Sequence, residues 1–209
     1  MFPNKRDPIK SHTAFPILFR DWEPDPEAEY RKLGLRIFTR SEQVSQALFD
    51  RVRRHIPATW STPSPKGDTI EHWRLRGLHE RIRFVCYGKG QRFPPHRDDP
   101  WVQSDAVRSF LTFVIYLSHS GTDRGADFEG GEFAFVEPLP KSTLVRDRVV
   151  VSPEPGLVVV FPHRELHESK ALQRGLKFMI RSDLMFEFDH SEPLKQAPDE
   201  AKSEATAAK

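Results

Sequence analysis

The chain has almost no cysteine and lacks a long apolar run. Cys86 is the single cysteine among 209 residues, which excludes an intrachain disulfide and is typical of a reducing compartment. The first residues, MFPNKRDPIKSHTAFPILF, contain prolines and charges that argue against a signal peptide. No segment approaches the roughly 20 consecutive apolar residues of a membrane span. We therefore expect a cytoplasmic protein that does not interact with a membrane.

An excess of charge of one sign is also absent. The chain has 32 basic and 30 acidic residues and a net charge of +2, so no overall field attracts a nucleic acid. We expect no nucleic-acid partner, and no feature of the sequence specifies an oligomeric state. The length suits one domain, or one domain with an extension.

The two ends of the chain differ from its middle. Residues 1–80 are predicted to form an N-terminal arm and supporting helices that pack on a β-rich core. Residues 61–68, STPSPKGD, predict a loop within this region. Residues 189–209 contain almost no apolar side chains and predict a disordered tail. The remaining segment, 81–188, is the predicted core.

One helix is indicated in the N-terminal region by the sequence SEQVSQALFDRVRRHIP. Its apolar residues recur at a spacing of four, at Val44, Leu48, Val52 and Ile56. This period predicts an amphipathic helix over residues 41–56, with Ser41 as its N-cap.

From residue 81 onwards the chain is rich in short runs of Val, Ile, Phe and Tyr, separated by Gly, Pro and Asp. The runs are RIRFVCY, SFLTFVIYLS, GEFAFVE, RVVVS, GLVVVFP and KFMIRSDLMFEF. Several of them alternate with a period of two, which is typical of strands. They predict a mainly β protein, an antiparallel sandwich or small barrel with flanking helices.

The stretch FPPHRDDPW, residues 93–101, places His96 and Asp98 two residues apart. On an extended chain, alternate side chains share a face, so both can bind one ion. His167 comes 69 residues after Asp98, beyond the run GLVVVFP. Two histidines and one carboxylate on one face of a metal leave three positions open, as in non-haem Fe(II) oxygenases.

Two alternatives compete with this interpretation. A His-x-Asp pattern also occurs by chance in solvated loops. His163 is a second candidate for the third ligand. If HRELH, residues 163–167, were helical, His163 and His167 would lie one turn apart, as in zinc enzymes. The preceding Val-rich run and proline argue against that helix.

The run KFMIRSDLMF carries cations on one strand face. Lys177, Met179 and Arg181 alternate with Phe178 and Ile180. If the first face is interior, its Lys and Arg need an anionic partner. Otherwise, that face is the solvated outside of the sheet.

Five blocks in this order resemble Fe(II)/2-oxoglutarate-dependent dioxygenases of the prolyl 4-hydroxylase type. They are YGKGQRFPPHRDD, SFLTFVIYLS, FEGGEFAF, PEPGLVVVFPHRELHES and GLKFMIRSDLMF, and they span roughly residues 80–187. The resemblance implies a double-stranded β-helix (a jelly roll, or cupin-like fold) that binds Fe(II), with 2-oxoglutarate and O2 as cosubstrates. It implies His96, Asp98 and His167 as the iron ligands.

The same resemblance implies which residues bind 2-oxoglutarate. Lys177 matches the residue that pairs with its distal carboxylate, Tyr87 matches a residue that supports this contact, and Arg181 is a secondary candidate. The turn Gly130-Gly131-Glu132 matches the turn that opens a strand beside the site, where glycine allows close backbone approach.

The expected activity is hydroxylation of an unactivated C–H bond, because the carboxylate that related halogenases lack is present here as Asp98. The resemblance favours a peptidyl or free amino-acid-like substrate. Arg92, Asp99 and Trp101 are candidates for binding this substrate. Hydroxylation of another small metabolite, or a non-catalytic cupin-like metal-binding module, are the alternatives.

Overall fold

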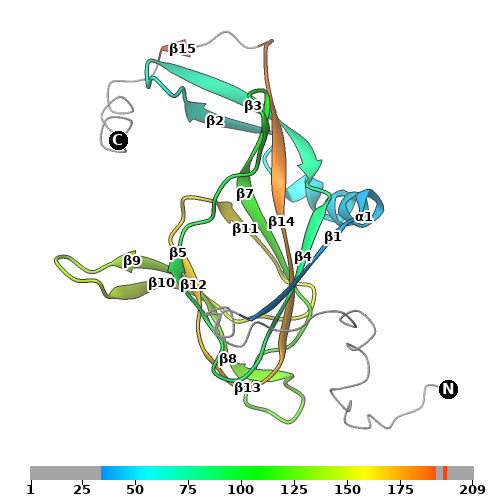
Figure 1. The fold of residues 1–209 in the computed structure, drawn as a ribbon, viewed down its shortest axis with the longest axis vertical. Coiled ribbons are helices and arrows are strands. Elements are labelled where there is room, and N and C mark those ends of the chain that lie inside the picture. The colour runs from blue at the N-terminus through cyan, green and yellow to red at the C-terminus, as the bar shows by residue number, and fades with distance from the viewer. Residues whose placement is uncertain (1–33, 192–194, 197–209) are drawn as a thin grey trace.

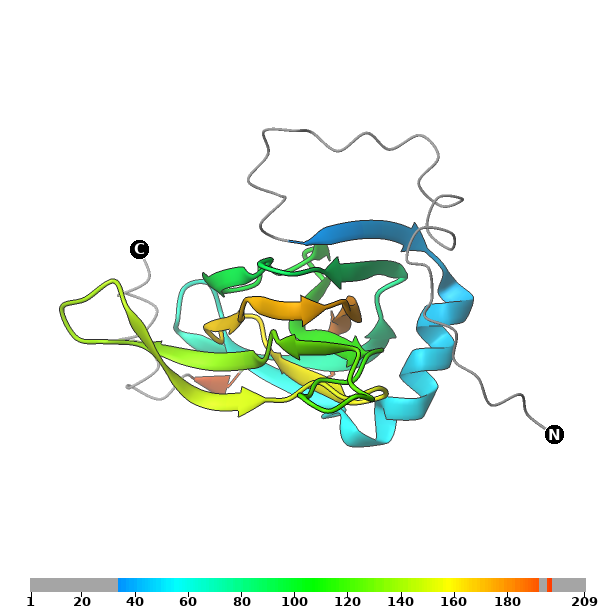
Figure 2. The ribbon, with the colours of Figure 1, turned by 90° about the horizontal axis from the view of Figure 1, so that it is seen from below.

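Antiparallel β-strands build the body of the protein as two facing sheets (Figures 1 and 2). The computed structural model describes residues 34–191 and 195–196. In chain order the elements are β1 (Leu35–Arg40), α1 (Glu42–Val52), the 3-10 turn η2 (Arg53–His55), β2 (Thr59–Pro63), β3 (Thr69–Leu78), β4 (Arg81–Tyr87), β5 (Phe93–His96), β6 (Val102–Ser104), β7 (Val107–Tyr116), β8 (Phe128–Gly130), β9 (Phe133–Pro138), β10 (Val145–Val151), β11 (Val158–Pro162), β12 (His167–Ser169), β13 (Leu172–Gly175), β14 (Lys177–Phe188) and β15 (Lys195–Gln196).

The larger sheet is organised around β14. The first half of β14 lies between β4 and β7, and its second half lies between β3 and β7. β1 extends the sheet beyond β4, and β11 extends it beyond β7. The smaller sheet has the order β10-β9-β12-β5, and β8 pairs with β13 beside it. Two facing antiparallel sheets of this kind form a double-stranded β-helix, as expected.

The main core lies on the face of the larger sheet that α1 covers. Trp73, Ile82, Phe113 and Phe186 are almost fully buried there, and Leu48, Phe49 and Val52 of α1 pack against them. Each such apolar side chain contributes about 1.5–3 kcal/mol when fully buried. Along β7, Leu111 and Phe113 join this core, whereas Thr112 and Val114 face the space between the sheets. Because alternate side chains of β7 point to opposite faces, one face of the strand packs in the core and the other lines the cavity between the sheets.

The predicted helix forms and begins where expected. The Ser41 hydroxyl accepts a hydrogen bond from the Val44 N–H at 3.2 Å, which satisfies one of the free donors at the helix start. The α-helix ends at Val52 and the chain continues as a 3-10 turn, so it is shorter than residues 41–56. Val44 is 40% exposed and does not take part in the buried stripe.

The region 34–80 contains more strand than expected. β3 pairs with β14, and β2 pairs with β3, so both belong to the larger sheet. Residues 61–63 of the predicted loop are therefore strand, because Thr59-Trp60-Ser61-Thr62 favours extended structure and Pro63 falls at the strand end. Most of the expected N-terminal arm lies outside the described residues. In the predicted disordered tail, Lys195–Gln196 pair with β3.

α1 is the one α-helix of the described ranges, and η2 is the one 3-10 helix there. In this part of the chain, no helix combines the length and apolar character that a membrane crossing requires.

Candidate metal centre

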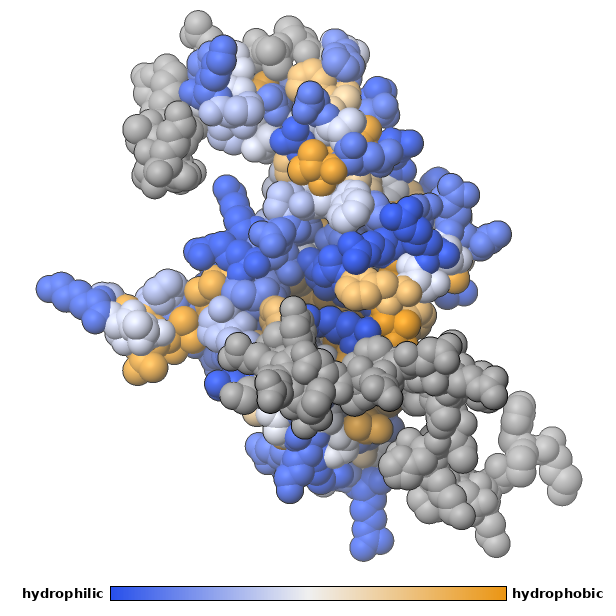
Figure 3. All heavy atoms as spheres, in the orientation of Figure 1, coloured by the Kyte–Doolittle hydropathy of each residue, from blue (hydrophilic) through white to orange (hydrophobic). Residues whose placement is uncertain are grey.

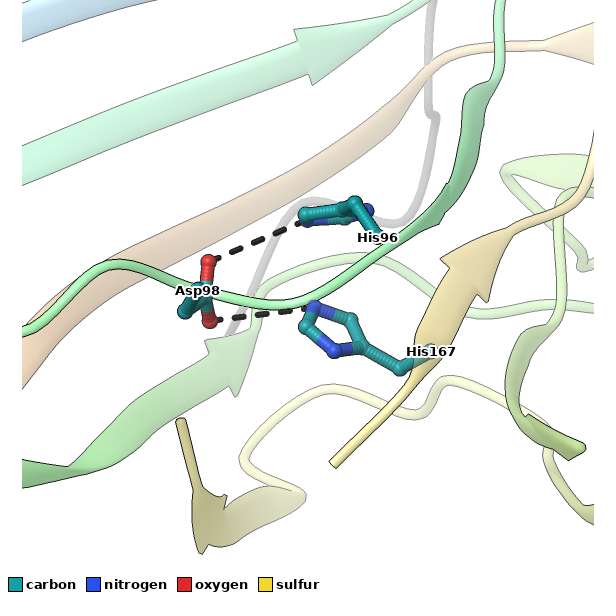
Figure 4. Close-up of side chains that lie close together, drawn as sticks. All are labelled: His96, Asp98 and His167. Carbon is teal, nitrogen blue, oxygen red and sulfur yellow. Dashed lines mark ion pairs between the residues drawn. The ribbon is translucent and has the colours of Figure 1, made fainter. Parts of the chain in front are cut away.

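Strand pairing brings His96 and His167 together although 71 residues separate them in the sequence. β5 and β12 are antiparallel neighbours in the smaller sheet, and His96 lies directly opposite His167 in their register. The chain leaves β5 at His96 and remains extended, so the side chain of Asp98 returns to the same place (Figure 4). The period-two spacing therefore works as the sequence predicts.

The three side chains point at one another (Figure 4). The Nε2 atoms of His96 and His167 lie 3.8 and 3.7 Å from the two oxygens of Asp98. One potential ligand atom from each of the three residues lies within 4.8 Å of the others. An ion between these atoms would touch all three side chains. Among the described residues, His96, Asp98 and His167 are the group of this kind.

Both imidazoles are oriented by backbone carbonyls. The Nδ1–H of His96 donates to the Pro94 carbonyl at 2.8 Å, and the Nδ1–H of His167 donates to the Glu165 carbonyl at 2.8 Å. Because the proton sits on Nδ1, the Nε2 lone pair faces the centre of the cluster. Burial, followed by the charge of His167, lowers the pKa of His96 to about 4, and burial also lowers the pKa of His167. Both rings are therefore neutral at pH 7, as metal ligands must be.

The third donor, Asp98, is held as a carboxylate. Burial opposes its ionisation, but the guanidinium of Arg181 and the hydroxyl of Thr112 together hold the pKa of Asp98 below its usual value. Arg181 Nη2 lies 2.9 Å from one oxygen of Asp98, and Thr112 Oγ1 donates to the other at 2.6 Å. Two neutral imidazoles and one ionised carboxylate are the donor set that suits Fe(II).

His163, the rival ligand, supports Asp98 from behind. Its Nδ1–H donates to Thr112 Oγ1 at 2.9 Å, because the single hydroxyl proton of Thr112 is already given to Asp98. Its Nε2 accepts from Ser109 Oγ at 2.8 Å, and Ser109 Oγ accepts the Trp101 N–H at 2.7 Å. These bonds form one directed chain from the backbone of Trp101 to the Asp98 carboxylate, which fixes the orientation of that carboxylate.

The zinc alternative built on HRELH is wrong. Residues 163–166 form a turn and residue 167 begins β12, so the segment is not helical. His163 is 6% exposed and turned towards Ser109 and Thr112. The chain leaves β11 through Pro162, and strand pairing with β5 then takes precedence over helix formation for His167.

Lys177 lies at the other end of the same cavity and is fully buried. Its ammonium group donates to the Gly131 carbonyl at 2.6 Å and to Ser169 Oγ at 2.7 Å. An ammonium has three donor hydrogens, so one remains for a ligand. Burial lowers the pKa of Lys177 to about 7, with Glu132 opposing this shift. Within the described residues no carboxylate forms an ion pair with this ammonium.

Tyr87 and the glycine turn surround Lys177 as expected. Tyr87 lies opposite Lys177 in the register of β4 and β14, and the Lys177 Nζ is 5.5 Å from the centre of its ring. Burial raises the pKa of Tyr87, so its hydroxyl remains a donor. Gly131 has a φ of +67°, and a Cβ there would lie 2.4 Å from Leu172 Cδ1. Glycine at this position therefore lets the backbone carbonyl reach Lys177.

Of the remaining predicted site residues, one lines the cavity. Arg181, the predicted secondary contact for the cosubstrate, lies in the cavity wall and pairs with Asp98. Arg92 and Asp99 are exposed, and Trp101 packs against His79 with the two rings tilted and their centres 5.0 Å apart. None of these last three lines the cavity between the sheets. These residues lie in loops, where the sequence does not indicate the direction in which a side chain points.

The cavity holds about 110 Å³ and runs from the His96–Asp98–His167 cluster to Lys177. Phe133, Phe161 and Met179 form part of its apolar wall, and Arg36 and Arg83 form part of its polar wall. Water occupies about 30 Å³ per molecule in the liquid, so the space suits a small organic acid beside an ion. Sequence reasoning did not identify Arg36, Ser169 or Thr112, whose roles depend on strand register.

The family model for the 2OG-Fe(II) oxygenase superfamily matches residues 82–182, a span that contains all three clustered residues and Lys177. The matched segment, residues 82–182, belongs to this superfamily. The protein is a 2-oxoglutarate-dependent dioxygenase, and its cofactor and cosubstrates are Fe(II), 2-oxoglutarate and O2. The neutral imidazoles and the ionised carboxylate of the cluster fit a divalent iron ion, and the buried ammonium fits a carboxylate.

Several solved structures resemble the fold of this oxygenase. A viral collagen prolyl hydroxylase from Paramecium Bursaria Chlorella virus-1 is 15% identical over 76% of this chain and 82% of its own, with a TM-score of 0.45. A Pseudomonas putida prolyl-4-hydroxylase is 17% identical over 81% and 79%, with a TM-score of 0.45. A Trichoplax adhaerens prolyl hydroxylase is 16% identical over 80% and 69%, with a TM-score of 0.45. Comparison with curated proteins gives no match.

Proposed function

We propose that this oxygenase hydroxylates an unactivated C–H bond of a peptidyl or free amino-acid-like substrate, with iron held by His96, Asp98 and His167. The observation that carries the assignment is the convergence of their ligand atoms within 4.8 Å. The family model covers all three residues. Bound Fe(II), together with 2-oxoglutarate and O2, supplies the oxidation of the C–H bond to an alcohol.

The protein's own contribution begins with preorganisation. Backbone carbonyls fix the tautomer of both imidazoles before metal arrives. The chain of hydrogen bonds through His163 and Thr112 fixes the carboxylate of Asp98. Because these groups already face one point, little side-chain entropy remains to be lost on metal binding.

We assign the distal carboxylate of 2-oxoglutarate to Lys177, with the Tyr87 hydroxyl beside it. The ammonium of Lys177 is buried, has one donor hydrogen to spare and lacks a carboxylate partner within the described ranges. An anion bound there relieves the cost of burying the cation. The apolar wall of Phe133, Phe161 and Met179 excludes water from the space between Lys177 and the metal cluster.

An anaerobic titration tests this proposal. Purified protein is loaded with Fe(II) and then titrated with 2-oxoglutarate while the visible spectrum is recorded. A weak charge-transfer band that saturates at one 2-oxoglutarate per chain is the expected result, and His96→Ala and His167→Ala should abolish it. A metal-binding module without catalysis would give no band and no succinate on admission of O2, and this result would overturn the proposal.

A further inference from the structure

Three arginines stand side by side across three neighbouring strands in the cavity wall. Arg36 on β1, Arg83 on β4 and Arg181 on β14 all line the cavity, and we call them the arginine row. Arg83 lies directly opposite Arg181 in the register of β4 and β14. Arg36 lies opposite Val85, so it is the diagonal neighbour of Arg83 on the same face, at roughly 7–8 Å between Cα atoms.

This arrangement is unfavourable for the fold by itself. Like charges directly opposite each other on adjacent strands destabilise a sheet. Burial, and after it the charge of Arg181, lowers the pKa of Arg83 to about 10, which reflects the cost of keeping that guanidinium charged. Side chains held in such a position at an active site are typical of groups that await a ligand.

The carboxylates near the row satisfy only one of its members. Arg181 pairs with Asp98 at 2.9 Å and lies 3.5 Å from Asp183. No described carboxylate forms an ion pair or hydrogen bond with Arg83 or Arg36. Arg36 instead lies over the Phe93 ring at 4.7 Å, and its positive charge acts to lower the pKa of Tyr87, against the larger effect of burial. Arg181 Nη1 is itself buried without a hydrogen-bond partner among the described residues.

The cavity wall carries more positive than negative charge, and this excess remains when Fe(II) and 2-oxoglutarate are bound. The wall contains the arginine row, Lys177 and one carboxylate, Asp98, and a second buried carboxylate, Asp183, lies behind it at 3.5 Å from Arg181, so the basic side chains outnumber the acidic ones. Fe(II) carries two positive charges and 2-oxoglutarate two negative ones, so binding both leaves the excess unchanged. In a space with apolar walls, uncompensated charge attracts a ligand of the opposite sign.

We propose that the substrate of this oxygenase carries a negatively charged oxyanion, a carboxylate or a phosphate, which Arg36 and Arg83 bind beside the metal cluster. The spare Nη1 donor of Arg181 completes the site. This inference rests on the proposed function and specifies its substrate class. Planar guanidinium groups match the geometry of both anions through paired N–H donors. The space-filling view shows hydrophilic side chains over the central part of the molecule, where β4 and β14 lie in the ribbon view (Figures 1 and 3).

Matched pairs of ligands test this inference with the full chain loaded with Fe(II) and 2-oxoglutarate without oxygen. N-acetyl-L-aspartate is compared with N-acetyl-L-asparagine, and N-acetyl-O-phosphoserine with N-acetylserine, by calorimetry. We expect at least one anion to bind at least about 10-fold more tightly than its neutral partner, and the two pairs distinguish carboxylate from phosphate. Equal affinity within both pairs, or no binding by either anion at millimolar concentration, would overturn the inference.

Substitutions of Arg83 test whether the arginine row causes the preference for anionic ligands. Arg83→Gln should remove the preference for the anion, Arg83→Lys should restore part of it, and Arg76→Gln, which removes the same charge from an exposed position on β3, should leave it unchanged. Arg83→Gln should have a Tm equal to or above that of the parent, because it relieves the repulsion with Arg181. A fall in Tm with an unchanged anion preference would show that Arg83 is structural.

The charge-transfer band keeps the two proposals apart. If Fe(II) and 2-oxoglutarate produce no band in the parent protein, the proposed function fails. If the band forms, also in Arg83→Gln, and the anions show no advantage, only the inference about the substrate fails.

Discussion

The metal cluster and the arginine row, two neighbouring regions of the cavity wall, differ in how far the protein satisfies its own polar groups. At the His96–Asp98–His167 cluster, both Nδ1–H groups and both carboxylate oxygens have protein partners. Along the arginine row, Arg36 and Arg83 have no carboxylate partner within the described residues, and Arg181 has a spare buried donor. The metal cluster is therefore fixed in one geometry before any ligand binds, whereas the arginine row retains positive charge that a ligand can neutralise. Preorganisation suits an ion of fixed geometry, and excess charge suits a substrate that must enter and leave.

Removing the carboxylate of Asp98 should have the largest effect on turnover, because it disrupts the preorganised metal cluster. Asp98→Ala deletes one metal ligand and leaves the buried guanidinium of Arg181 without its closest partner. We expect 2-oxoglutarate turnover, measured as succinate release, to fall by more than about 100-fold, and the Tm to fall as well. Full turnover by iron-saturated Asp98→Ala would remove the metal assignment. Asp123→Ala, which changes an exposed carboxylate, is the matched control.

Lys177→Ala should weaken 2-oxoglutarate binding by roughly 10- to 100-fold, because a charge-assisted hydrogen bond to a buried carboxylate contributes about 1.5–3 kcal/mol. The saturation of the charge-transfer band with 2-oxoglutarate measures this change, while Fe(II) affinity should remain near that of the parent. Lys170→Ala is the control, since its ammonium is exposed and pairs with Asp147. An unchanged 2-oxoglutarate affinity would place the cosubstrate elsewhere in the cavity.

His163→Ala should lower the affinity for Fe(II) by about 10- to 100-fold, although His163 is not a ligand in this account. The variant interrupts the hydrogen-bond chain that fixes Thr112 and Asp98. His163→Asn can return an N–H donor near the position of Nδ1 and should recover part of the affinity. If both variants bind Fe(II) as tightly as the parent, the orientation of Asp98 does not depend on this chain.

The pH dependence of 2-oxoglutarate binding should be the mildest of these effects. In the free protein burial lowers the pKa of Lys177 to about 7, so the ammonium form becomes the minority as the pH rises above 7. In the proposed site, the cosubstrate carboxylate binds that protonated form. The Kd should therefore rise by up to about 10-fold between pH 7 and pH 8.

Lys177→Arg separates this titration from other causes. Arginine remains charged throughout that range, so the Kd for 2-oxoglutarate should be nearly independent of pH in the variant. Equal slopes in the parent and Lys177→Arg would show that another group is responsible.

The convergence of His96 and Asp98 and the shared strand face of Lys177 and Arg181 could be predicted from the sequence, because their signals are local. His96 and Asp98 are two residues apart on an extended segment, and Lys177, Met179 and Arg181 alternate along one strand. The side chains of this strand face and the three residues of the cluster line one cavity in the structure. The strand-like runs themselves predict an antiparallel sandwich or small barrel, and the double-stranded β-helix follows from the resemblance to prolyl 4-hydroxylase-type dioxygenases.

What could not be predicted depends on register between distant strands. The pairing of Arg181 with Asp98, the position of Arg83 opposite Arg181, and the support that His163 gives to Thr112 all arise from strand pairing or turn geometry. Arg92, Asp99 and Trp101 are polar or aromatic and close to the motif in sequence, which makes them candidates for substrate binding from the sequence alone. In the structure they lie outside the wall of the cavity, because proximity in a loop does not determine the direction of a side chain.

The position of bound iron tests the central claim most directly. A crystal grown without oxygen in the presence of Fe(II) and 2-oxoglutarate should show an anomalous peak at the iron edge. Our account predicts this peak between Nε2 of His96, the carboxylate of Asp98 and Nε2 of His167, within bonding distance of each. A peak beside His163 or at the protein surface, with these three side chains turned apart, would contradict the account.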